Sequence, residues 1–374
     1  MMKIIYPGQT IGIIGGGQLG RMMALAAKEA GFKIAVLEPT MDSPCGQVAD
    51  IRILAPYDDE AALEELAEVS DVITYEFENI DYEGLKRLTE MAYVPQGAEL
   101  VRITQDRVTE KAAIVEAGCP VAPYVVASTY EKLVENIETI GYPCIVKTAR
   151  GGYDGKGQQL LKSAADLTLA EELFTHSQCI AEGFVPFMKE VSVIVQRNGD
   201  GESYCQPVGE NIHVHHILHE TIVPARITEE TAQAVEREAK KIADYLNLVG
   251  TLAVEMFVLE NGDIVINELA PRPHNSGHYS IEACNVSQFH QHIRAVCGWP
   301  LRKPKLWAPS IMVNVLGQHV MPLSNLITKY PDWSLHLYGK AEAKVNRKMG
   351  HVTIMTKDLE QTLQEIEHSG VWSE

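Results

Sequence analysis

Short apolar runs alternate with amphipathic stretches over the first hundred residues. The runs at 10–14, 33–37 and 71–74 have the length of buried strands, and the stretches 19–30 and 59–69 repeat apolar residues at helical spacing. Strands that alternate with helices in this way pair in parallel. We therefore predict an α/β region with a doubly wound parallel sheet at the N-terminus.

The pattern changes near residue 143 to longer strands rich in β-branched residues. A helical pattern at 105–117, followed by Gly118 and Pro120, precedes this change. Asn261-Gly262 predicts a tight hairpin and antiparallel pairing, which is typical of an α+β region. We expect strands at 144–147, 179–181, 190–196, 212–222, 251–259, 263–268, 310–316 and 350–355, and helices at about 164–175, 228–246 and 358–368.

Composition and charge exclude several classes of protein. The 374-residue chain has 32 Lys and Arg against 50 Asp and Glu, so its net charge of -18 repels nucleic acid and anionic membranes. No apolar run reaches the roughly 18 residues of a membrane span, the N-terminus lacks a signal-peptide pattern, and the seven cysteines include no CxxC pair. We expect a cytoplasmic protein that binds neither nucleic acid nor membrane. Any anionic substrate would need a local basic pocket.

A glycine-rich turn, GGGQLG at 15–20, follows the first strand and opens a helix, and Glu38 ends the next strand. Such a turn can bind the pyrophosphate of a dinucleotide at the helix N-terminus, while an acidic residue holds the ribose. A tight strand-to-helix turn also favours glycine for steric reasons alone. The motif therefore leaves a dehydrogenase, another phosphorylated ligand and a purely structural turn open.

The central region carries a second set of phosphate-binding features. Lys147 ends a strand, and a glycine loop at 152–158 follows it without the spacing of a Walker A motif. Glu182 and Glu190 lie at the ends of successive strands, which we expect to form a hairpin that binds the ribose and base of a nucleotide.

Carboxylates and a proline-stiffened loop follow. The predicted hairpin sets Glu255 beside Glu268, with Asn267 adjacent, and oxygen ligands of this kind suit Mg²⁺ bridging phosphates. Arg272 can hold a carbonate or phosphate oxygen, and His274, expected to titrate near neutrality, can act as acid or base.

Four nearby histidines do not predict zinc. His213 and His215 would share one face of the expected strand while His216 points the other way, which makes no tetrahedral site. We expect them, with His219, to be solvated or to lie beside a nucleotide.

The order of these features resembles the ATP-grasp superfamily. More specific strings are similar to the 5-(carboxyamino)imidazole ribonucleotide synthase family, and the match spans residues 10–355. These strings are GGGQLGRM at 15–22, TYEFENI at 74–80, QDR at 105–107, GGYDGKGQ at 151–158, NELAPRPHNSGHYS at 267–280, YGK at 338–340 and RKMGH at 347–351.

The resemblance implies a fold and a reaction. The fold has a pre-ATP-grasp domain at 1–105, an ATP-grasp domain at 106–300 with a lid at about 120–190, and a small C-terminal domain at 301–374. The reaction joins bicarbonate to the amine of 5-aminoimidazole ribonucleotide through carboxyphosphate, with ATP and Mg²⁺ (or Mn²⁺) as cofactors, in de novo purine biosynthesis. A homodimer is implied as well. Another ATP-grasp ligase, a dehydrogenase and a non-catalytic nucleotide-binding module are the alternatives.

The resemblance also implies roles for individual residues. Arg272 and His274 would be catalytic, and Glu255 and Glu268 would bind the metal. The implied ATP-binding residues are Arg107, Lys147, Gly152, Tyr153, Asp154, Gly155, Lys156, Gly157, Gln158, Glu182, Gly183, Phe184, Val185, Glu190, His213, Asn267 and Glu268. The implied ribonucleotide-binding residues are Gln18, Leu19, Glu76, Tyr153, Asn275, Ser276, Lys340, Arg347 and Lys348. Lys156 stands where the family frequently has arginine.

Overall fold

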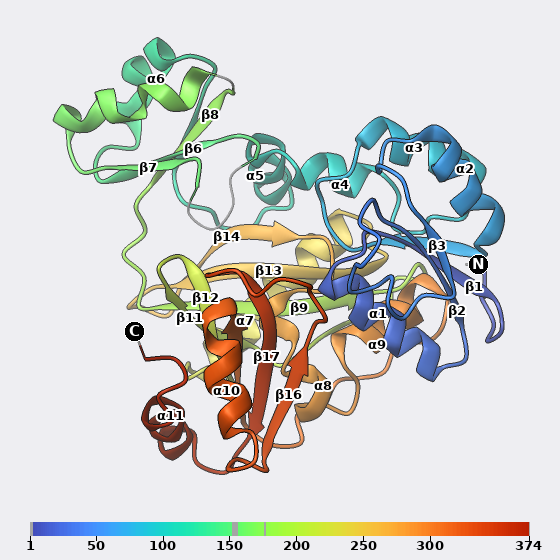
Figure 1. Ribbon diagram of the computed structural model, residues 1–374. Coiled ribbons are helices and arrows are strands. Elements are labelled where there is room, and N and C mark those ends of the chain that lie inside the picture. Colours follow the sequence, from blue (N-terminus) through green and yellow to red (C-terminus); the bar gives the residue numbers. More distant parts are fainter. Residues whose placement is uncertain (1–2, 152–155, 176, 374) are drawn as a thin grey trace.

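A four-stranded parallel sheet forms the N-terminal part of the computed structural model, which describes residues 3–151, 156–175 and 177–373 (Figure 1). Its order is β3-β2-β1-β4, which confirms the predicted α/β region. Helix α9 of the central region packs with α1 against one face of it. The elements are β1 (Thr10–Ile14), α1 (Gln18–Glu29), β2 (Lys33–Leu37), β3 (Ile51–Ile53), α2 (Glu60–Val69), β4 (Val72–Tyr75), α3 (Tyr82–Met91) and α4 (Glu99–Thr104).

A second, antiparallel sheet of order β5-β8-β6-β7 projects from the body of the molecule (Figure 1). Helix α5 (Arg107–Glu116) connects the N-terminal part to it. The helix expected at 164–175 is a 3-10 segment, η2 (Ala164–Thr175). The remaining elements are β5 (Tyr124–Ala127), α6 (Tyr130–Asn136), η1 (Ile137–Thr139), β6 (Cys144–Thr148), β7 (Gln158–Leu161) and β8 (Cys179–Gly183).

A nine-stranded sheet makes up the rest, in the order β14-β13-β9-β11-β12-β15-β17-β16 with β10 beside β9. Because β15 pairs with β12, the strands after residue 300 continue the central sheet. The three-domain division stays a prediction. The elements are β9 (Lys189–Arg197), β10 (Ser203–Cys205), β11 (Gly209–Val214), β12 (Ile217–Val223), α7 (Glu229–Tyr245), β13 (Gly250–Val258), β14 (Ile264–Ala270), η3 (Asn275–Gly277), α8 (Ser280–Ala283), α9 (Gln288–Val296), β15 (Ser310–Leu316), η4 (Gly317–His319), α10 (Val320–Leu326), β16 (Trp333–Leu337), β17 (Lys348–Met355) and α11 (Leu359–His368).

Two details of the expected strand pattern are wrong. The strand expected at 212–222 is a hairpin of β11 and β12, with His215 and His216 in its turn at φ 50° and 64°. A two-residue hairpin turn of type I′ needs two left-handed residues, and here histidines supply them without the usual Asn-Gly signal. His213 and His215 therefore do not share a strand face. The strands that carry Glu182 and Glu190 belong to different sheets, so these acids are not hairpin partners.

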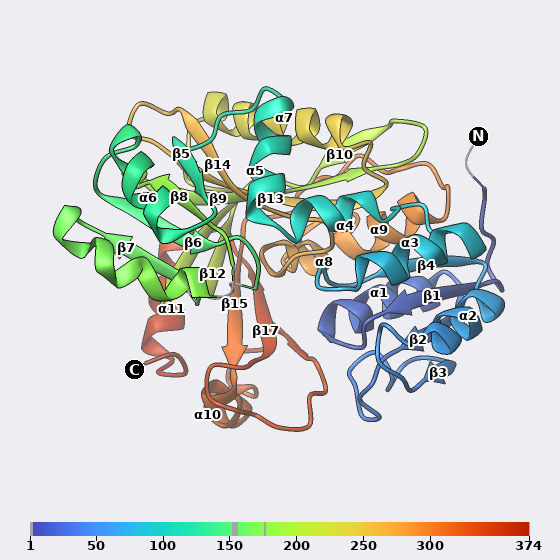
Figure 2. The same ribbon diagram turned by 90° about the horizontal axis from the view of Figure 1, so that it is seen from above.

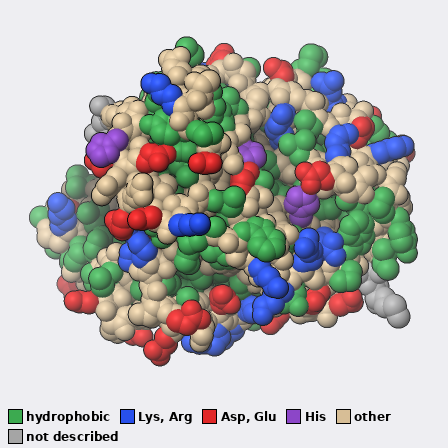
Figure 3. Space-filling view, turned by 90° about the horizontal axis from the view of Figure 1, so that it is seen from below, with side chains coloured by type: hydrophobic (Ala, Val, Ile, Leu, Met, Phe, Trp, Pro, Cys, Tyr) green, Lys and Arg blue, Asp and Glu red, His purple; other side chains and the backbone are tan. Residues whose placement is uncertain are grey.

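The surface shows no single dominant charge on the face in Figure 3, where acidic and basic side chains are interspersed. Among the helices of the described residues, none is both long and apolar enough to cross a membrane.

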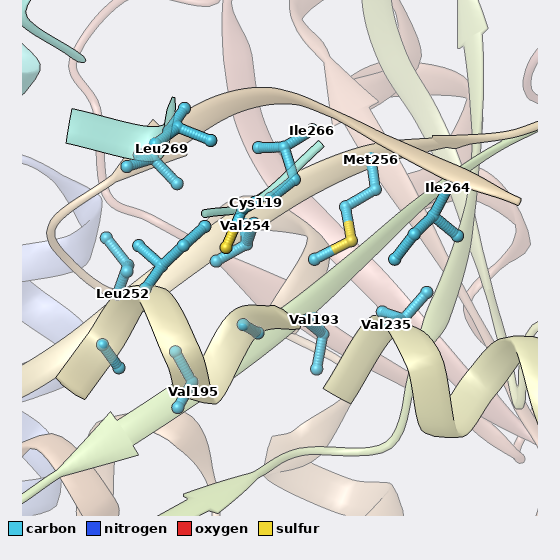
Figure 4. Close-up of a cluster of buried hydrophobic side chains, with 14 of the residues drawn as sticks. Cys119, Val193, Val195, Val235, Leu252, Val254, Met256, Ile264, Ile266 and Leu269 are labelled. Carbon is cyan, nitrogen blue, oxygen red and sulfur yellow. The ribbon is translucent and has the colours of Figure 1, made fainter. Parts of the chain in front are cut away.

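One face of the large sheet is buried beneath α7, as Figure 2 shows from above. Val193, Val195, Val254 and Met256 belong to the same buried cluster as Val235 of this helix and are at most 1% exposed (Figure 4). Because side chains alternate along a strand, the residues between these point to the opposite face. That opposite face carries the candidate site.

Candidate functional site

A cavity of about 430 Å³ lies where the three parts of the chain meet. The N-terminal part contributes Glu78, the projecting sheet contributes Lys147, and β17 contributes Lys348. The predicted residues that line it are Arg107, Lys147, Lys156, Gln158, Glu190, His213, Glu255, Asn267, Glu268, Arg272, His274 and Lys348. The fold thus brings twelve expected residues that are far apart in the sequence to one cavity.

A β-bulge sets the two candidate metal ligands side by side. Glu255 pairs directly with Glu268, and the register then shifts so that Met256 pairs with Ile266. Ile266 and Leu269 both point into the core under α7. Without the extra residue, strict alternation would aim residue 268 at that core as well. The bulge turns Glu268 to the cavity side instead.

Burial and the charge of Glu268 raise the pKa of two neighbouring carboxyl groups. Burial, and then the charge of Glu268, raises the pKa of Glu255 to about 7. Burial and Glu268 also raise the pKa of Glu110 to about 8, and its Oε1 accepts a 2.6 Å hydrogen bond from the Leu269 N–H. Arg107 Nη1 lies 3.4 Å from Glu268 Oε2. The excess negative charge of these carboxylates favours the binding of a cation beside them.

The two carboxylates fit a Mg²⁺ site better than a site in which every metal ligand comes from the protein. Among the described residues, no group of three or more His, Cys, Asp or Glu could hold a metal ion. Mg²⁺ keeps several waters and is commonly held by one or two carboxylates together with substrate phosphates. The pair Glu255 and Glu268 supplies that number of oxygen ligands.

Lys147 meets Glu182 rather than standing free in the cavity. Its Nζ lies 2.5 Å from Glu182 Oε2, and Nζ of Lys111 lies 2.5 Å from Oε1 of the same carboxylate. Burial alone would raise the pKa of Glu182, but Lys147 and Lys111 lower it to about 2.

A smaller, mostly apolar cavity of about 60 Å³ adjoins the first and shares Lys147 and Asn267 with it. The rings of Phe187 and Phe257 stack 4.5 Å apart, and both residues line it. The expected residues Glu182, Gly183, Phe184 and Val185 lie here.

Arg272 is already paired within the protein. Its Nε donates to Glu78 Oε2 at 2.6 Å and its Nη2 donates to Oε1 at 3.2 Å, which fixes the plane of the guanidinium group. Glu78 lies in the string TYEFENI, but nothing in the local pattern singled it out. The structure therefore shows how Arg272 is oriented at the cavity wall.

His274 does not titrate near neutrality, contrary to our expectation. Burial and the nearby Arg272 charge lower its pKa well below 6.5. Its Nδ1 lies 2.9 Å from Ser276 Oγ, and its Nε2 lies 3.5 Å from Glu255 Oε1. The ring is thus a neutral imidazole held by one nitrogen.

The side chains of Asn275 and Ser276 are buried rather than presented to a ligand. Asn275 forms a reciprocal amide pair with Asn314 of β15, at 2.8 and 2.7 Å, and Ser276 Oγ lies 2.7 Å from Ser192 Oγ. These bonds fasten the loop after Arg272 to the large sheet. This placement argues for positioning rather than for the expected substrate contact.

Of the three expected phosphate-binding cations, only Lys348 lines the 430 Å³ cavity. Lys340 Nζ donates to the Lys348 carbonyl at 2.6 Å, and burial, followed by repulsion from Arg347, lowers its pKa to about 8. Arg347 is exposed, and its Nη1 donates to the Glu342 carbonyl at 3.1 Å.

Part of the expected glycine loop lies outside the described residues, namely Gly152, Tyr153, Asp154 and Gly155. Beyond it, the Gly157 carbonyl accepts a 2.9 Å hydrogen bond from the Thr148 N–H, and Gln158 pairs with Lys147 across the β6–β7 ladder.

The N-terminal glycine turn is filled by the protein's own carboxylates. Glu76 accepts hydrogen bonds from the N–H groups of Gly17 and Gly20, the latter at 2.6 Å, at the start of α1. Glu38 accepts from the Gly16 N–H at 2.8 Å. A Cβ atom at residue 17 would lie 2.6 Å from Glu76 Oε1, which explains this glycine. The positive end of the helix is thus already neutralised. Gln18 begins α1 half-buried, whereas Leu19 is buried in the core behind it.

This geometry predicts that the turn binds no dinucleotide. A pyrophosphate would have to displace the Glu38 and Glu76 carboxylates from these N–H groups, and it would meet their negative charge. We expect no saturable binding of NADH or NADPH up to about 1 mM, a concentration at which binding free energies of about 4 kcal/mol would be detected. Fluorescence titration measures this, and a micromolar dissociation constant would revive the dehydrogenase interpretation.

Comparison with known proteins agrees with this geometry. Three family models match in succession: the ribonucleotide synthetase preATP-grasp domain at 8–105, the ATP-grasp domain at 112–289, and the phosphoribosylaminoimidazole carboxylase C-terminal domain at 310–365. A curated protein of Bacillus subtilis (strain 168), named N5-carboxyaminoimidazole ribonucleotide synthase, is 53% identical over 97% of this chain and 96% of its own. This chain belongs to the N5-carboxyaminoimidazole ribonucleotide synthase family. It is an ATP-grasp ligase by fold and by family.

Two solved structures of the family extend the comparison. An ADP complex of an N5-carboxyaminoimidazole ribonucleotide synthetase is 57% identical, with a TM-score of 0.97 over 100% of this chain and 99% of that one. An Aspergillus clavatus N5-carboxyaminoimidazole synthase in complex with ADP and 5-aminoimidazole ribonucleotide is 29% identical, with a TM-score of 0.90 over 96% of this chain and 97% of that one. The predicted fold class is confirmed.

The residues at or beside this family site that the sequence analysis did not select include Glu78, Glu110, Lys111 and Asn314. Glu110 and Lys111 lie about one helical turn after Arg107, so helical spacing could have placed them on its face. Nothing in the local pattern marks Glu78 or Asn314, because their partners are remote in sequence.

The pKa of Glu255 predicts a measurable dependence of stability on pH. The folded protein keeps this proton up to about pH 7, whereas the ordinary value is 4.5, so the folded state binds more protons between these limits. Stability from this group therefore falls as pH rises through the interval, and Glu255→Gln removes the effect. In metal-free buffer with a chelator, we expect the Tm of the variant minus that of the wild type to increase from pH 5 to pH 8. A difference that stays constant would contradict the charge crowding described here.

Proposed function

We propose that this protein carboxylates 5-aminoimidazole ribonucleotide with bicarbonate and ATP, giving N5-carboxyaminoimidazole ribonucleotide, ADP and phosphate, in de novo purine biosynthesis. The observation that carries the proposal is the meeting of Lys147, Arg107 and Arg272 with the Glu255–Glu268 pair at one cavity. This arrangement can bind phosphate oxygens, a divalent cation and a carbonate side by side. A family relative is named N5-carboxyaminoimidazole ribonucleotide synthase, and a solved relative holds ADP and 5-aminoimidazole ribonucleotide.

ATP would span the two adjoining cavities. We place adenine in the apolar 60 Å³ cavity, framed by Glu182, Gly183, Phe184 and Val185, and the phosphates in the larger one. Arg107, Lys147, Lys156 and Gln158, with Gly152 to Gly157 of the loop, would bind the phosphates, and Glu190, His213 and Asn267 would complete the nucleotide site.

Glu255 and Glu268 would hold Mg²⁺, or Mn²⁺ in its place. When bound, the ion neutralises charge that builds on the transferring phosphoryl group. The site would bind the cation because the crowded carboxylates of Glu255, Glu268 and Glu110 repel one another when no cation is bound.

Carboxylation would proceed in two steps. A bicarbonate oxygen attacks the γ-phosphorus and ADP leaves, which forms carboxyphosphate. The amine nitrogen of the ribonucleotide then bonds to the carboxyl carbon, the bond from that carbon to the phosphate oxygen breaks, and the departing phosphate takes the proton that the amine loses. Arg272, oriented by Glu78, would bind the carbonate oxygens, and the neutral imidazole of His274, whose Nδ1 accepts the Ser276 N–H at 3.3 Å, can donate a hydrogen bond from Nε2.

The ribonucleotide would lie between the N-terminal part and β17. Lys348, with Lys340 and Arg347 beside it, would bind the phosphate, and Gln18, Glu76 and Tyr153 would lie near the aminoimidazole. Leu19, Asn275 and Ser276 would support this site from the interior, since their side chains are buried.

Release of inorganic phosphate tests the proposal directly. We expect Mg²⁺-dependent phosphate release from ATP that requires both the ribonucleotide and bicarbonate for its full rate, with the carboxylated product detected by trapping ¹³C-bicarbonate. Phosphate release that is unaffected by omitting the ribonucleotide would contradict the proposed substrate.

We propose a homodimer located in the cytoplasm, on the basis of the family resemblance. Sedimentation velocity at micromolar concentration tests the first part, and a monomer would contradict it.

A further inference from the structure

Helix α5 sets a second buried lysine against the carboxylate that pairs with Lys147. Lys111 Nζ lies 2.5 Å from Glu182 Oε1, and Lys147 Nζ lies 2.5 Å from Oε2. The three side chains are 3%, 13% and 9% exposed for Lys111, Lys147 and Glu182. Lys111 lies outside every sequence motif described above. Two ammonium groups thus share one buried carboxylate.

The two lysines differ in what they can reach. Lys147 lines both cavities, whereas Lys111 lines only the smaller one. Lys111 Nζ also donates to the Asn267 carbonyl on β14 at 3.3 Å. Lys111 is therefore fixed between the projecting sheet, through Glu182, and the large sheet, through Asn267. Lys147 stands at the junction where a bound nucleotide would pass from base to phosphate.

Charge balance explains why both lysines are present. Burying an unpaired charge is costly, so a lone Glu182–Lys147 pair would hold Lys147 in place and oppose its transfer to a phosphate. With Lys111 present, Glu182 keeps a counter-charge when Lys147 turns away. The surplus positive charge then favours an incoming anion.

We propose that Lys111 is a positioning residue for ATP: it holds and neutralises Glu182 and thereby releases Lys147 to bind the nucleotide phosphates. This inference rests on the proposed ATP site. It assigns Lys111 no contact with the reacting atoms.

A double-mutant cycle tests the inference on the full-length protein, with Mg²⁺ADP binding measured by calorimetry. The variants are Lys111→Met, Glu182→Gln and the double variant, with Lys132→Met of the exposed Lys132–Glu135 pair as the matched control. We expect Lys111→Met to weaken ADP binding about tenfold or more, the size of a lost charged hydrogen bond. We expect the double variant to bind ADP more tightly than Lys111→Met, because Lys147 is free again. The KM for ATP should rise with Lys111→Met, while the KM for the ribonucleotide stays within about twofold.

The comparison of Glu182→Gln with the double variant gives a result even where Lys111→Met alone fails to fold. Once Glu182 is neutral, Lys111 has no charge to hold, so its removal from Glu182→Gln should change ADP affinity by no more than about twofold. A further loss well beyond that, or a Lys111→Met protein that binds ADP like the wild type, overturns the inference. Wild-type protein that binds ADP but releases no phosphate with ribonucleotide and bicarbonate would instead contradict the proposed function and leave this cycle interpretable.

Discussion

Glu268→Gln is expected to lower the rate of ATP hydrolysis on the order of 100-fold or more, while the protein stays folded. The substitution removes a charge that faces Glu255 and Arg107 at nearly constant volume. Fewer like charges then crowd the site, so stability should not fall. What is lost is the pair of carboxylates that can hold a divalent cation against the phosphates.

Steady-state phosphate release at saturating Mg²⁺ and ATP measures this effect. Glu260→Gln is the matched control, because Glu260 is an exposed acid in the turn of the same hairpin and does not line the 430 Å³ cavity. Activity of Glu268→Gln within a fewfold of the control would remove the metal-binding role. A circular dichroism melt separates this outcome from unfolding.

Arg272→Ala is expected to reduce phosphate release that depends on bicarbonate on the order of 100-fold or more, with ADP affinity within about threefold of the wild type. Arg272 lines the large cavity but not the small one, so the base end of the nucleotide should be unaffected. Glu78→Gln leaves the guanidinium in place and weakens only the bond that orients it. We therefore expect a smaller loss for Glu78→Gln, on the order of tenfold.

The exposed Arg102, paired with Glu99, offers a control as Arg102→Ala. Bicarbonate-dependent phosphate release and calorimetric ADP binding should both be unchanged in that variant. If Arg272→Ala weakens ADP binding as strongly as Lys147→Ala, Arg272 belongs to the nucleotide site and not to the carbonate site. If Arg272→Ala and Glu78→Gln lose equal amounts of phosphate release, the orientation of the guanidinium group by Glu78 accounts for the whole contribution of Arg272.

Much of the fold was predictable because local periodicity matches the final elements. The strand expected at 33–37 has the bounds of β2, and the helix expected at 228–246 differs from α7 by one residue at each end. Hydrophobic spacing is a local signal, so it identifies such elements well. Pairing between distant segments is not local. The continuation of the central sheet into β15, β17 and β16, and the placement of β8 and β9 in different sheets, could not be read from spacing.

The candidate site shows the same division. Residue types with strong chemical preferences, such as Lys147, Glu268 and Arg272, were selected from the sequence and meet at one cavity. Their partners were not selected. Glu78 and Lys111 owe their importance to contacts with Arg272 and Glu182, which lie far along the chain. The protonation of His274 also depends on burial and on a neighbouring charge, and the sequence predicted it wrongly.

The sequence by itself determined the parallel N-terminal sheet, the hairpin at Asn261-Gly262 and the ligand types of the site, because each depends on neighbouring residues or on side-chain chemistry. Only the tertiary structure decided which groups remain available to a ligand. It fills the glycine turn with Glu76 and Glu38, which a motif alone would leave open to a dinucleotide. It also bulges β14 so that Glu268 faces Glu255 instead of the core beneath α7. Both results depend on packing between distant segments, and at these two places that packing overrides the structure that the local pattern predicts.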